Sequence, residues 1–228
     1  MPSQSQDAEP QVASAPQGAP APLSGRRAQA ARNDGAILDA ARRVFVDDPE
    51  APVAAVAQAA GVGISALYRR YPSKEELLAR LCLDGLRRFV AVASEADVVP
   101  DPWEAFATFL RGIVDADVHS LTVRLAGRFR PTEEHRSLAA DAGERAGRIL
   151  ARAQDAGVVR ADVTDDDLPM VYEQLTAVRL GDAARTAELR ARYVDLQLEG
   201  LRARADAAAL PGPPPAPAEL GARWRYRE

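Results

Sequence analysis

Cysteine and histidine are scarce in this chain of 228 residues. Cys82 is the only cysteine, so no internal disulfide can form, and this usage fits a cytoplasmic location. His119 and His135 are the only histidines, and no cysteine or other histidine stands near either of them at the spacing of metal ligands. We therefore expect no metal site, and we expect Cys82 to be a small buried side chain.

Long apolar runs and enzyme motifs are also missing. No stretch approaches the roughly 18 apolar residues of a membrane span, and residues 1–25 lack the basic start and apolar stretch of a signal peptide. We find no phosphate-binding loop, nucleophile elbow or paired-carboxylate motif. The three consecutive acids at residues 165–167 suit the first turn of a helix rather than a catalytic pair. We therefore expect no membrane partner, no cofactor, no catalytic residue and no enzymatic activity.

Lysine is almost absent, since Lys74 is the only lysine among 29 lysine and arginine residues. The net charge of −4 argues against a general binder of polyanions, but it leaves room for a local basic face. Residues 26–74 carry eight basic residues and five acidic ones. This part of the chain is therefore net positive within an acidic protein.

Alanine and apolar residues at helical spacing are abundant, whereas the alternation typical of strands is rare. The chain is 47% hydrophobic, which is enough to bury a core. We therefore predict an all-α protein. The predicted helices cover residues 32–46, 52–60, 63–71, 73–93, 101–117, 121–129, 131–157, 164–181 and 185–205.

Composition and helix length divide the chain into four predicted parts. Residues 1–25 are rich in Pro, Ala, Ser and Gln, and we expect them to be disordered because they cannot bury enough apolar surface. Residues 26–74 form a small domain with three helices. Residues 75–206 form a larger helical body, and residues 207–228 form a Pro-rich C-terminal tail.

The helices at residues 52–60 and 63–71 are predicted to form a helix–turn–helix. Ala57 provides the small residue at the helix contact, and Gly61 ends the first helix. Pro72 stops the second helix, and Ser73 with Glu76 forms a capping box that starts the next one. The N-terminal half of the second helix is then free to enter a DNA major groove.

This second helix presents residues of two kinds to DNA. Ser65 can hydrogen-bond to a base edge, and Ile64 can contact a thymine methyl group. Tyr68, Arg70 and Lys74 lie where phosphates would pass, while Arg69 is either a DNA contact or a solvated charge. The candidate DNA-binding residues are Gly63, Ile64, Ser65, Tyr68, Arg69, Arg70 and Lys74.

The segment VAAVAQAAGVGISALYRRYPSKEELL, residues 53–78, resembles the DNA-binding motif of the TetR family of bacterial repressors. The pair GV, the pair LY, the aromatic residue before proline and the run SKEEL stand in the family's register, and residues 37–45 resemble its first helix. The C-terminal YVDLQLEGLRA, followed by a Pro-rich stretch, is similar to an actinobacterial subgroup. The resemblance implies a homodimer that binds a palindromic operator in double-stranded DNA and is released by a small-molecule effector.

Several residues depart from the pattern of this family. Gly63 and Ala66 stand where the family usually has Ser and Thr, so two hydroxyl groups are lost at the reading helix. Arg70 stands where His is usual, which keeps a cation near phosphate. The two lost hydroxyl groups motivate an alternative function, a helical module for small-molecule binding or protein interaction with weak or vestigial DNA binding.

The resemblance also implies a ligand pocket and a dimer interface in the C-terminal region. The effector is unknown, but an aromatic content of 5% argues against a flat aromatic drug. The pocket candidates also fit core or surface positions, and the apolar stripes of the last two long helices also fit packing within one monomer. The ligand-binding candidates are Trp103, Phe106, Arg124 and Arg128. The dimer-interface candidates are Val171, Leu175, Val178, Leu189, Tyr193 and Leu196.

Overall fold

The computed structural model describes residues 25–225, without the side chains of residues 25–32, 120, 122 and 123. Within this range the chain is helical, with one isolated β-bridge between Val159 and Arg202, so the predicted all-α class is confirmed. The predicted disorder of residues 1–25 lies outside the described range, except for Gly25, which begins the first helix. The helices are α1 (Gly25–Asp47), α2 (Val53–Ala60), α3 (Ile64–Arg70), α4 (Lys74–Asp97), α5 (Pro102–Asp115), α6 (Val118–Leu125), α7 (Glu133–Asp155), α8 (Leu168–Ala177), α9 (Ala183–Leu201) and α10 (Pro217–Ala222).

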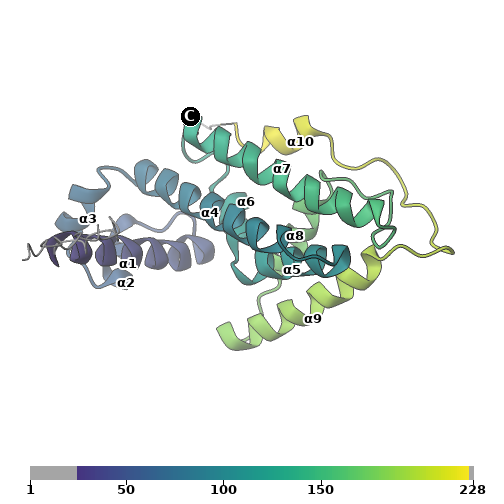
Figure 1. Cartoon of the computed structure of the whole chain (residues 1–228). Helices are drawn as coiled ribbons and strands as arrows, with labels where there is room; N and C mark the ends of the chain where they lie inside the picture. The colour runs from purple at the N-terminus through teal and green to yellow at the C-terminus, as the bar shows by residue number, and fades with distance from the viewer. Residues whose placement is uncertain (1–24, 226–228) are drawn as a thin grey trace, which may run out of the picture.

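One helix, α10, lies in the Pro-rich segment where the sequence predicted no helix. Pro217 occupies the first position of α10, where a missing backbone N–H costs nothing. The Glu219 carboxylate accepts a hydrogen bond from the Ala216 backbone N–H at 2.7 Å and so caps the helix. In Figure 1 the chain leaves the end of α9, passes around the body and returns along its upper side as α10.

Helices α1, α2 and α3 gather at one end of the molecule around their own core (Figure 1). Phe45, Val56 and Leu67 are fully buried there, together with Leu77 and Leu81 from the start of α4. The core also includes side chains from α6 and the loop after it, namely Leu121, Leu125 and Phe129. The small unit therefore rests directly on part of the larger body.

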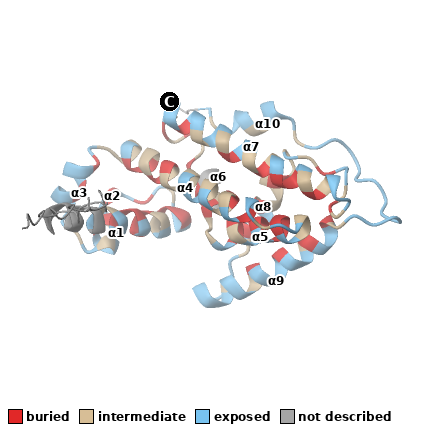
Figure 2. Ribbon diagram, viewed as in Figure 1, coloured by how far each residue is buried: buried red, intermediate tan, exposed pale blue. Residues whose placement is uncertain are grey.

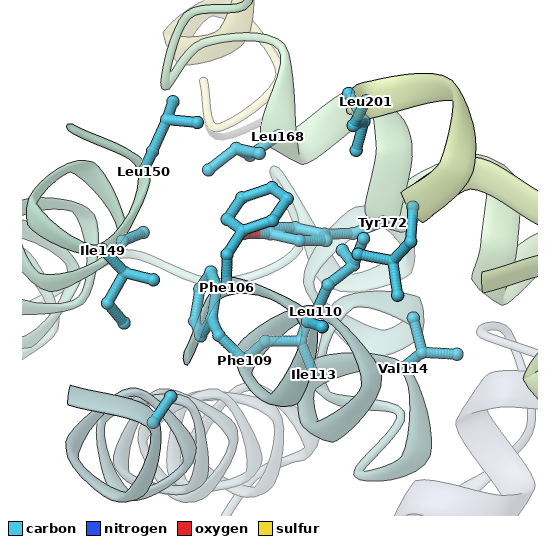
Figure 3. Close-up of a cluster of buried hydrophobic side chains, with 14 of the residues drawn as sticks. Phe106, Phe109, Leu110, Ile113, Val114, Ile149, Leu150, Leu168, Tyr172 and Leu201 are labelled. Atoms are coloured by element: carbon cyan, nitrogen blue, oxygen red, sulfur yellow. The ribbon is translucent and has the colours of Figure 1, made fainter. Parts of the chain in front are cut away.

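The body has a second core centred on α5, which buries Phe106, Phe109 and Leu110 completely. Figure 3 shows Tyr172 among these side chains, with Ile149 and Leu150 of α7 on the opposite side. The rings of Phe109 and Tyr172 meet edge to face at 6.2 Å, which is a favourable arrangement for aromatic pairs. In Figure 2 the buried residues concentrate between the helices, while the outer side of α9 is mostly exposed.

Helix α4 belongs to both cores. Its first turns bury Leu77, Leu78 and Leu81 under the small unit, and its later turns bury Ala93 and Ala96 in the body.

Across residues 25–225, no helix is both long enough and apolar enough to cross a membrane. No group of three or more His, Cys, Asp or Glu side chains in the described range is arranged to hold a metal ion.

Candidate DNA-binding surface and ligand cavity

The turn between α2 and α3 is closed by backbone hydrogen bonds. The Gly61 N–H donates to the Gln58 carbonyl at 3.1 Å, and the Val62 N–H donates to the Ala57 carbonyl at 3.0 Å. Gly61 has a φ of 66°, a left-handed conformation that favours glycine. The two helices thus form the predicted helix–turn–helix, with Leu67 and Tyr71 buried as its anchors.

The remaining residues of α3 face solvent. Ile64 is 40% exposed and Tyr68 is 47% exposed, and at a spacing of four residues the two side chains lie on the same face of the helix. Arg69 is exposed and makes no hydrogen bond or ion pair with another described residue. The predicted base-reading positions Gly63 and Ser65 are exposed beside Ile64. A short helix therefore presents an apolar, a hydroxyl, a phenol and a guanidinium group on one open surface.

Arg70 is engaged with α1 as well as with solvent. Its Nε donates to Asp34 Oδ1 at 2.9 Å, although 54% of the Arg70 side chain remains exposed. The Tyr71 hydroxyl donates to the same carboxylate oxygen. Burial opposes ionisation of Asp34, but the hydrogen bonds from Arg70 and Tyr71 outweigh it and lower the pKa of Asp34. Burial and the Asp34 carboxylate together raise the pKa of Tyr71 to about 12.

Lys74 makes contacts within the protein at the first position of α4. Its Nζ donates to the Ala51 carbonyl at 3.0 Å and lies 5.3 Å from the centre of the Phe45 ring. The Ser73 hydroxyl next to it accepts from the Glu76 N–H at 3.1 Å, so the predicted helix cap is present. Lys74 therefore ties α4 to the loop between α1 and α2, a role that the sequence did not suggest.

The body contains a cavity of about 460 Å³. It lies between α4, α6, α7 and α8, and the loop after α6 and the segment after α10 complete its wall. The residues that line it include Cys82, Leu86, Phe89, His119, Phe129, His135, Ala142, Ala146, Leu168, Tyr172 and Trp224.

The four residues proposed from sequence as ligand contacts do not line this cavity. Phe106 is fully buried in the body core, and Trp103 stacks under the Arg202 guanidinium at 3.7 Å. Arg128 forms an ion pair with Glu50 and donates to the Arg124 carbonyl at 2.9 Å. Trp103, Phe106 and Arg128 thus contact other neighbours, which helix periodicity alone does not reveal.

Two residues of the cavity wall each have a buried polar atom that lacks a hydrogen-bond partner within the described range. The atoms are Nε2 of His119 and the hydroxyl oxygen of Tyr172. Burial lowers the pKa of His119 to about 4, so its imidazole is neutral at pH 7. Burial also raises the pKa of Tyr172 above its usual range and raises that of Cys82 to about 12. The inner wall is therefore uncharged at these three side chains.

His135, the other histidine of the wall, has partners for both ring nitrogens. Nδ1 lies 2.7 Å from the Thr132 hydroxyl and also accepts from the Thr132 backbone N–H at 3.2 Å. Nε2 lies 2.9 Å from the Ala79 carbonyl of α4. His135 therefore fixes the start of α7 against α4, while His119 is the histidine with unused capacity.

The dimer-interface candidates divide into inner and outer residues. Leu175 is 2% exposed and packs within the body core. Tyr193 is 40% exposed and Leu196 is 66% exposed on the side of α9 opposite to buried Val194. The partly buried candidates are Val171, Val178 and Leu189.

The arrangement defines a DNA-binding protein of the helix–turn–helix class with a separate helical body. Residues 37–81 match the model described as bacterial regulatory proteins of the tetR family. Residues 101–203 match the model described as the C-terminal domain of SbtR-like transcriptional regulators. A TetR regulator of known structure from Mycobacterium vanbaalenii is 30% identical, with a TM-score of 0.53, and the match covers 78% of this chain and 99% of that chain.

The chain belongs to the TetR family. It is therefore a DNA-binding transcriptional regulator and not an enzyme. The transcriptional repressor LfrR of Mycolicibacterium smegmatis is 37% identical over 87 residues, which are 38% of this chain and 44% of that repressor. A structure of LfrR from Mycobacterium smegmatis in complex with proflavine has the same fold, with 24% identity, a TM-score of 0.52 and coverage of 75% of this chain and 97% of that one.

Proposed function

We propose that this regulator is a homodimeric repressor that binds a palindromic operator and is released when a small molecule occupies the cavity. Family membership favours this function over a helical module with weak DNA binding. The exposed face of α3, from Ile64 to Arg70, is the proposed DNA contact. Ser65 and Ile64 would read bases, and Tyr68, Arg69 and Arg70 would contact phosphates.

The observation that carries this proposal is the position of α6 between the cavity and the small unit. His119 lines the cavity, whereas Leu121 and Leu125 of the same helix are buried in the core shared with α1 and α4. A ligand that displaces His119 therefore displaces a helix on which the DNA-binding unit rests. The ligand shifts the equilibrium only if it binds the two positions of α6 with different affinity.

Helix α4 gives a second connection between the same two regions. Leu86 and Phe89 border the cavity, and Leu77 and Leu81, about two turns earlier, are fully buried in the core of the small unit. Because α4 begins at the Ser73 cap directly after α3, a tilt of α4 also reorients the reading helix. In a dimer, such a tilt would change the separation of the two reading helices.

The outer face of α9 supports a homodimer. Tyr193 and Leu196 are exposed there and, with partly buried Leu189, form an apolar stripe at helical spacing along α9. A second copy of the chain would bury this stripe against its own, as two-fold symmetry requires. Leu175 would support the interface from within the monomer core rather than touch the partner.

The ligand of LfrR in its solved structure is proflavine, which supports a small-molecule effector for this regulator too. Here the effector would occupy the cavity beside His119 and Tyr172. The candidates Trp103, Phe106, Arg124 and Arg128 would act indirectly, through the body core and the contact with Glu50.

Selection from a random pool of duplex DNA tests the proposal. The purified protein should recover a palindrome whose half-sites lie about one turn, roughly 34–36 Å, apart. Light scattering of the free protein should give a dimer, and Leu196→Asp should give a monomer that loses the operator. Leu180→Asp is the control, because Leu180 is exposed to 62% but precedes α9. A monomeric wild type, or a pool with no palindrome, would contradict the proposal.

A further inference from the structure

Two residues of the cavity wall, His119 and Tyr172, each carry an unused hydrogen-bonding group that is buried just behind the apolar surface of the cavity. Tyr172 is only 3% exposed, and its hydroxyl has no partner within the described residues. His119 meets the Tyr172 ring edge to face at 5.5 Å, and its Nε2 is likewise unpaired. Leaving such groups buried and unpaired destabilises the empty protein. A ligand that bonds to them would remove that penalty.

The rest of this wall excludes charge. Phe89 packs edge to face on Tyr172 at 6.1 Å, and Leu168 and Ala146 add further apolar surface. The Cys82 thiol is neutral because burial raises its pKa to about 12. Glu173, Arg223 and Asp117 act electrostatically on His119, but Glu173 already pairs with Arg223, and Asp117 with Arg190. A charged ligand would therefore lose its hydration here for little gain in counter-charge, and this loss is large.

Charged residues of the cavity lie at its rim. Arg136 and Asp165 are exposed, and Asp166 is partly exposed. Arg136 already pairs with Glu133 at 2.7 Å. These groups face water, so they do not offset the cost of a charge placed beside Tyr172.

Resting on the proposed function, we infer that the effector is an uncharged, mainly apolar molecule with one carbonyl or hydroxyl group. This group bonds to Tyr172 and His119 after the two side chains rotate toward the cavity. The tyrosine hydroxyl donates to a ligand carbonyl or accepts from a ligand hydroxyl. His119 Nε2 does either, according to its tautomer. The cavity volume of about 460 Å³ accommodates a molecule of two or three rings.

Three probes of one shape test this chemistry. Benzophenone has a carbonyl, diphenylmethane lacks it, and diphenylmethylammonium carries a charge in its place. By calorimetry with the full chain, benzophenone should bind about tenfold more tightly than diphenylmethane, the combined effect of its bonds to Tyr172 and His119. The ammonium should bind more weakly than either. A preference for the ammonium or for diphenylmethane, or no binding of any probe, would overturn the inference.

The variant Tyr172→Phe keeps the ring and removes only the hydroxyl. It should reduce the preference for benzophenone from about tenfold to about threefold, the part that the bond to His119 contributes. Its unchanged affinity for diphenylmethane would show that the cavity is intact. Because an unpaired hydroxyl is lost, the melting temperature without ligand should not fall. A preserved preference for benzophenone, or a lower melting temperature, would contradict the assignment of this hydroxyl.

Operator binding separates the ligand chemistry from the proposed function. If benzophenone binds with the expected preference but leaves operator affinity unchanged, the ligand class stands and the release mechanism fails. If the ammonium binds best and releases the operator, the ligand class fails and the release mechanism stands.

A different observation concerns the C-terminal strap, residues 207–225. The strap is tied to the body at its start, where the Leu210 N–H donates to Asp162 at 2.9 Å. At its far end Arg223 pairs with Glu173 of α8 at 2.6 Å, and Trp224 meets the ring of Phe129 at 6.2 Å. Trp224 also forms part of the cavity wall, and the family model for the C-terminal domain ends before the strap, at residue 203.

The backbone of the loop after α6 lies very close to the backbone of the strap. Gly127 has a φ of 76°, and a Cβ atom at this position would lie 2.8 Å from the Arg225 carbonyl oxygen. Only glycine therefore allows this close approach of two backbones. The geometry points to the strap as a lid on the effector cavity, which opens when Trp224 leaves Phe129.

Paired glycine variants test the lid. Gly127→Ala should displace the strap, while Gly157→Ala is matched in conformation, with a φ of 69°, but meets no atom within 4 Å. In stopped-flow measurements of Trp224 fluorescence in a Trp103→Phe background, Gly127→Ala should raise both rate constants for benzophenone about tenfold. Gly157→Ala should change them less than twofold. Equal rate constants for benzophenone in Gly127→Ala and Gly157→Ala would contradict the proposal that the strap is a lid.

Discussion

The two regions joined by α4 present their binding groups in opposite ways. The small unit has a filled core and displays its binding side chains on the exposed face of one short helix, α3. The body instead contains a partly open cavity, and two residues of its wall carry buried polar atoms that lack a partner among the described residues. A surface of the first kind is encoded in consecutive residues. A cavity of the second kind depends on four helices, a loop and a strap that meet only in the folded chain.

The largest expected effect comes from removing an anchor of the exposed surface. Leu67 is fully buried beneath α3, so Leu67→Ala should lower the free energy of unfolding by about 3 kcal/mol. Because Leu67 holds α3 in place, operator binding should be lost, as measured by fluorescence anisotropy. Benzophenone affinity should change less than twofold, because Leu67 is not part of the cavity wall.

The matched change in the body is Leu110→Ala, which also removes a fully buried leucine. It should cost a similar free energy of unfolding. Operator affinity without ligand should fall much less than in Leu67→Ala. Equal losses of operator affinity in the two variants would mean that the DNA-binding unit has no core of its own.

Two neighbouring arginines sharpen the description of the surface. Arg69→Ala and Arg70→Ala should each weaken binding to operator and to random DNA about tenfold, and each should reduce the salt dependence by about one ion. Only Arg70→Ala should lower the melting temperature because, of the two arginines, Arg70 is the one that bonds to Asp34. Anisotropy titrations at several salt concentrations measure the affinity and its salt dependence, and thermal unfolding measures the melting temperature. An unchanged salt dependence in Arg70→Ala would make Arg70 a purely structural residue.

The small unit was predictable from sequence because its determinants are local. Gly61, Pro72 and the Ser73 cap mark the ends of helices through rules that act over a few residues. The engagement of Arg70 and Lys74 was not predictable, since their partners Asp34 and Ala51 lie far away along the chain. Helical periodicity identifies which face is apolar but not which distant group a long basic side chain reaches.

The cavity was not predictable for a related reason. Trp103 and Phe106 were candidates because of their size and helix, yet α5 turns both toward neighbours other than the cavity. His119 and Tyr172 carry no sequence signal of an unpaired polar atom, because pairing depends on tertiary neighbours. The strap was not predicted from sequence, because a Pro-rich composition is typical of irregular backbone and does not indicate the capped helix α10.

The buried histidine should make stability depend on pH in a defined window. Burial lowers the pKa of His119 from 6.5 to about 4, so between these values the unfolded chain binds a proton that the folded chain does not. Stability from this group is complete above pH 6.5 and falls as pH decreases toward 4. From pH 7 to pH 5.5 the loss is about 1.2 kcal/mol.

Denaturant unfolding of wild type and His119→Leu at these two pH values measures this loss. The variant should lack the part of the pH dependence that belongs to His119. In the small unit, the buried anchor Tyr71 should respond only at alkaline pH. Its pKa is raised to about 12, so its contribution is complete below pH 10 and is lost above it. Identical pH profiles for wild type and His119→Leu would show that His119 is hydrated.

The smallest expected effect concerns Lys74, where surface and core meet. Lys74→Met keeps the aliphatic chain over Phe45 but removes the hydrogen bond to the Ala51 carbonyl, so we expect a loss of about 0.5 kcal/mol in unfolding free energy. If the ammonium remains on Ala51 when DNA is bound, the salt dependence of operator binding should equal that of the wild type. A reduction by about one ion would instead mean that Lys74 leaves Ala51 for a phosphate. The loop between α1 and α2 would then be released on DNA binding, and the small unit would be less rigid than its filled core suggests.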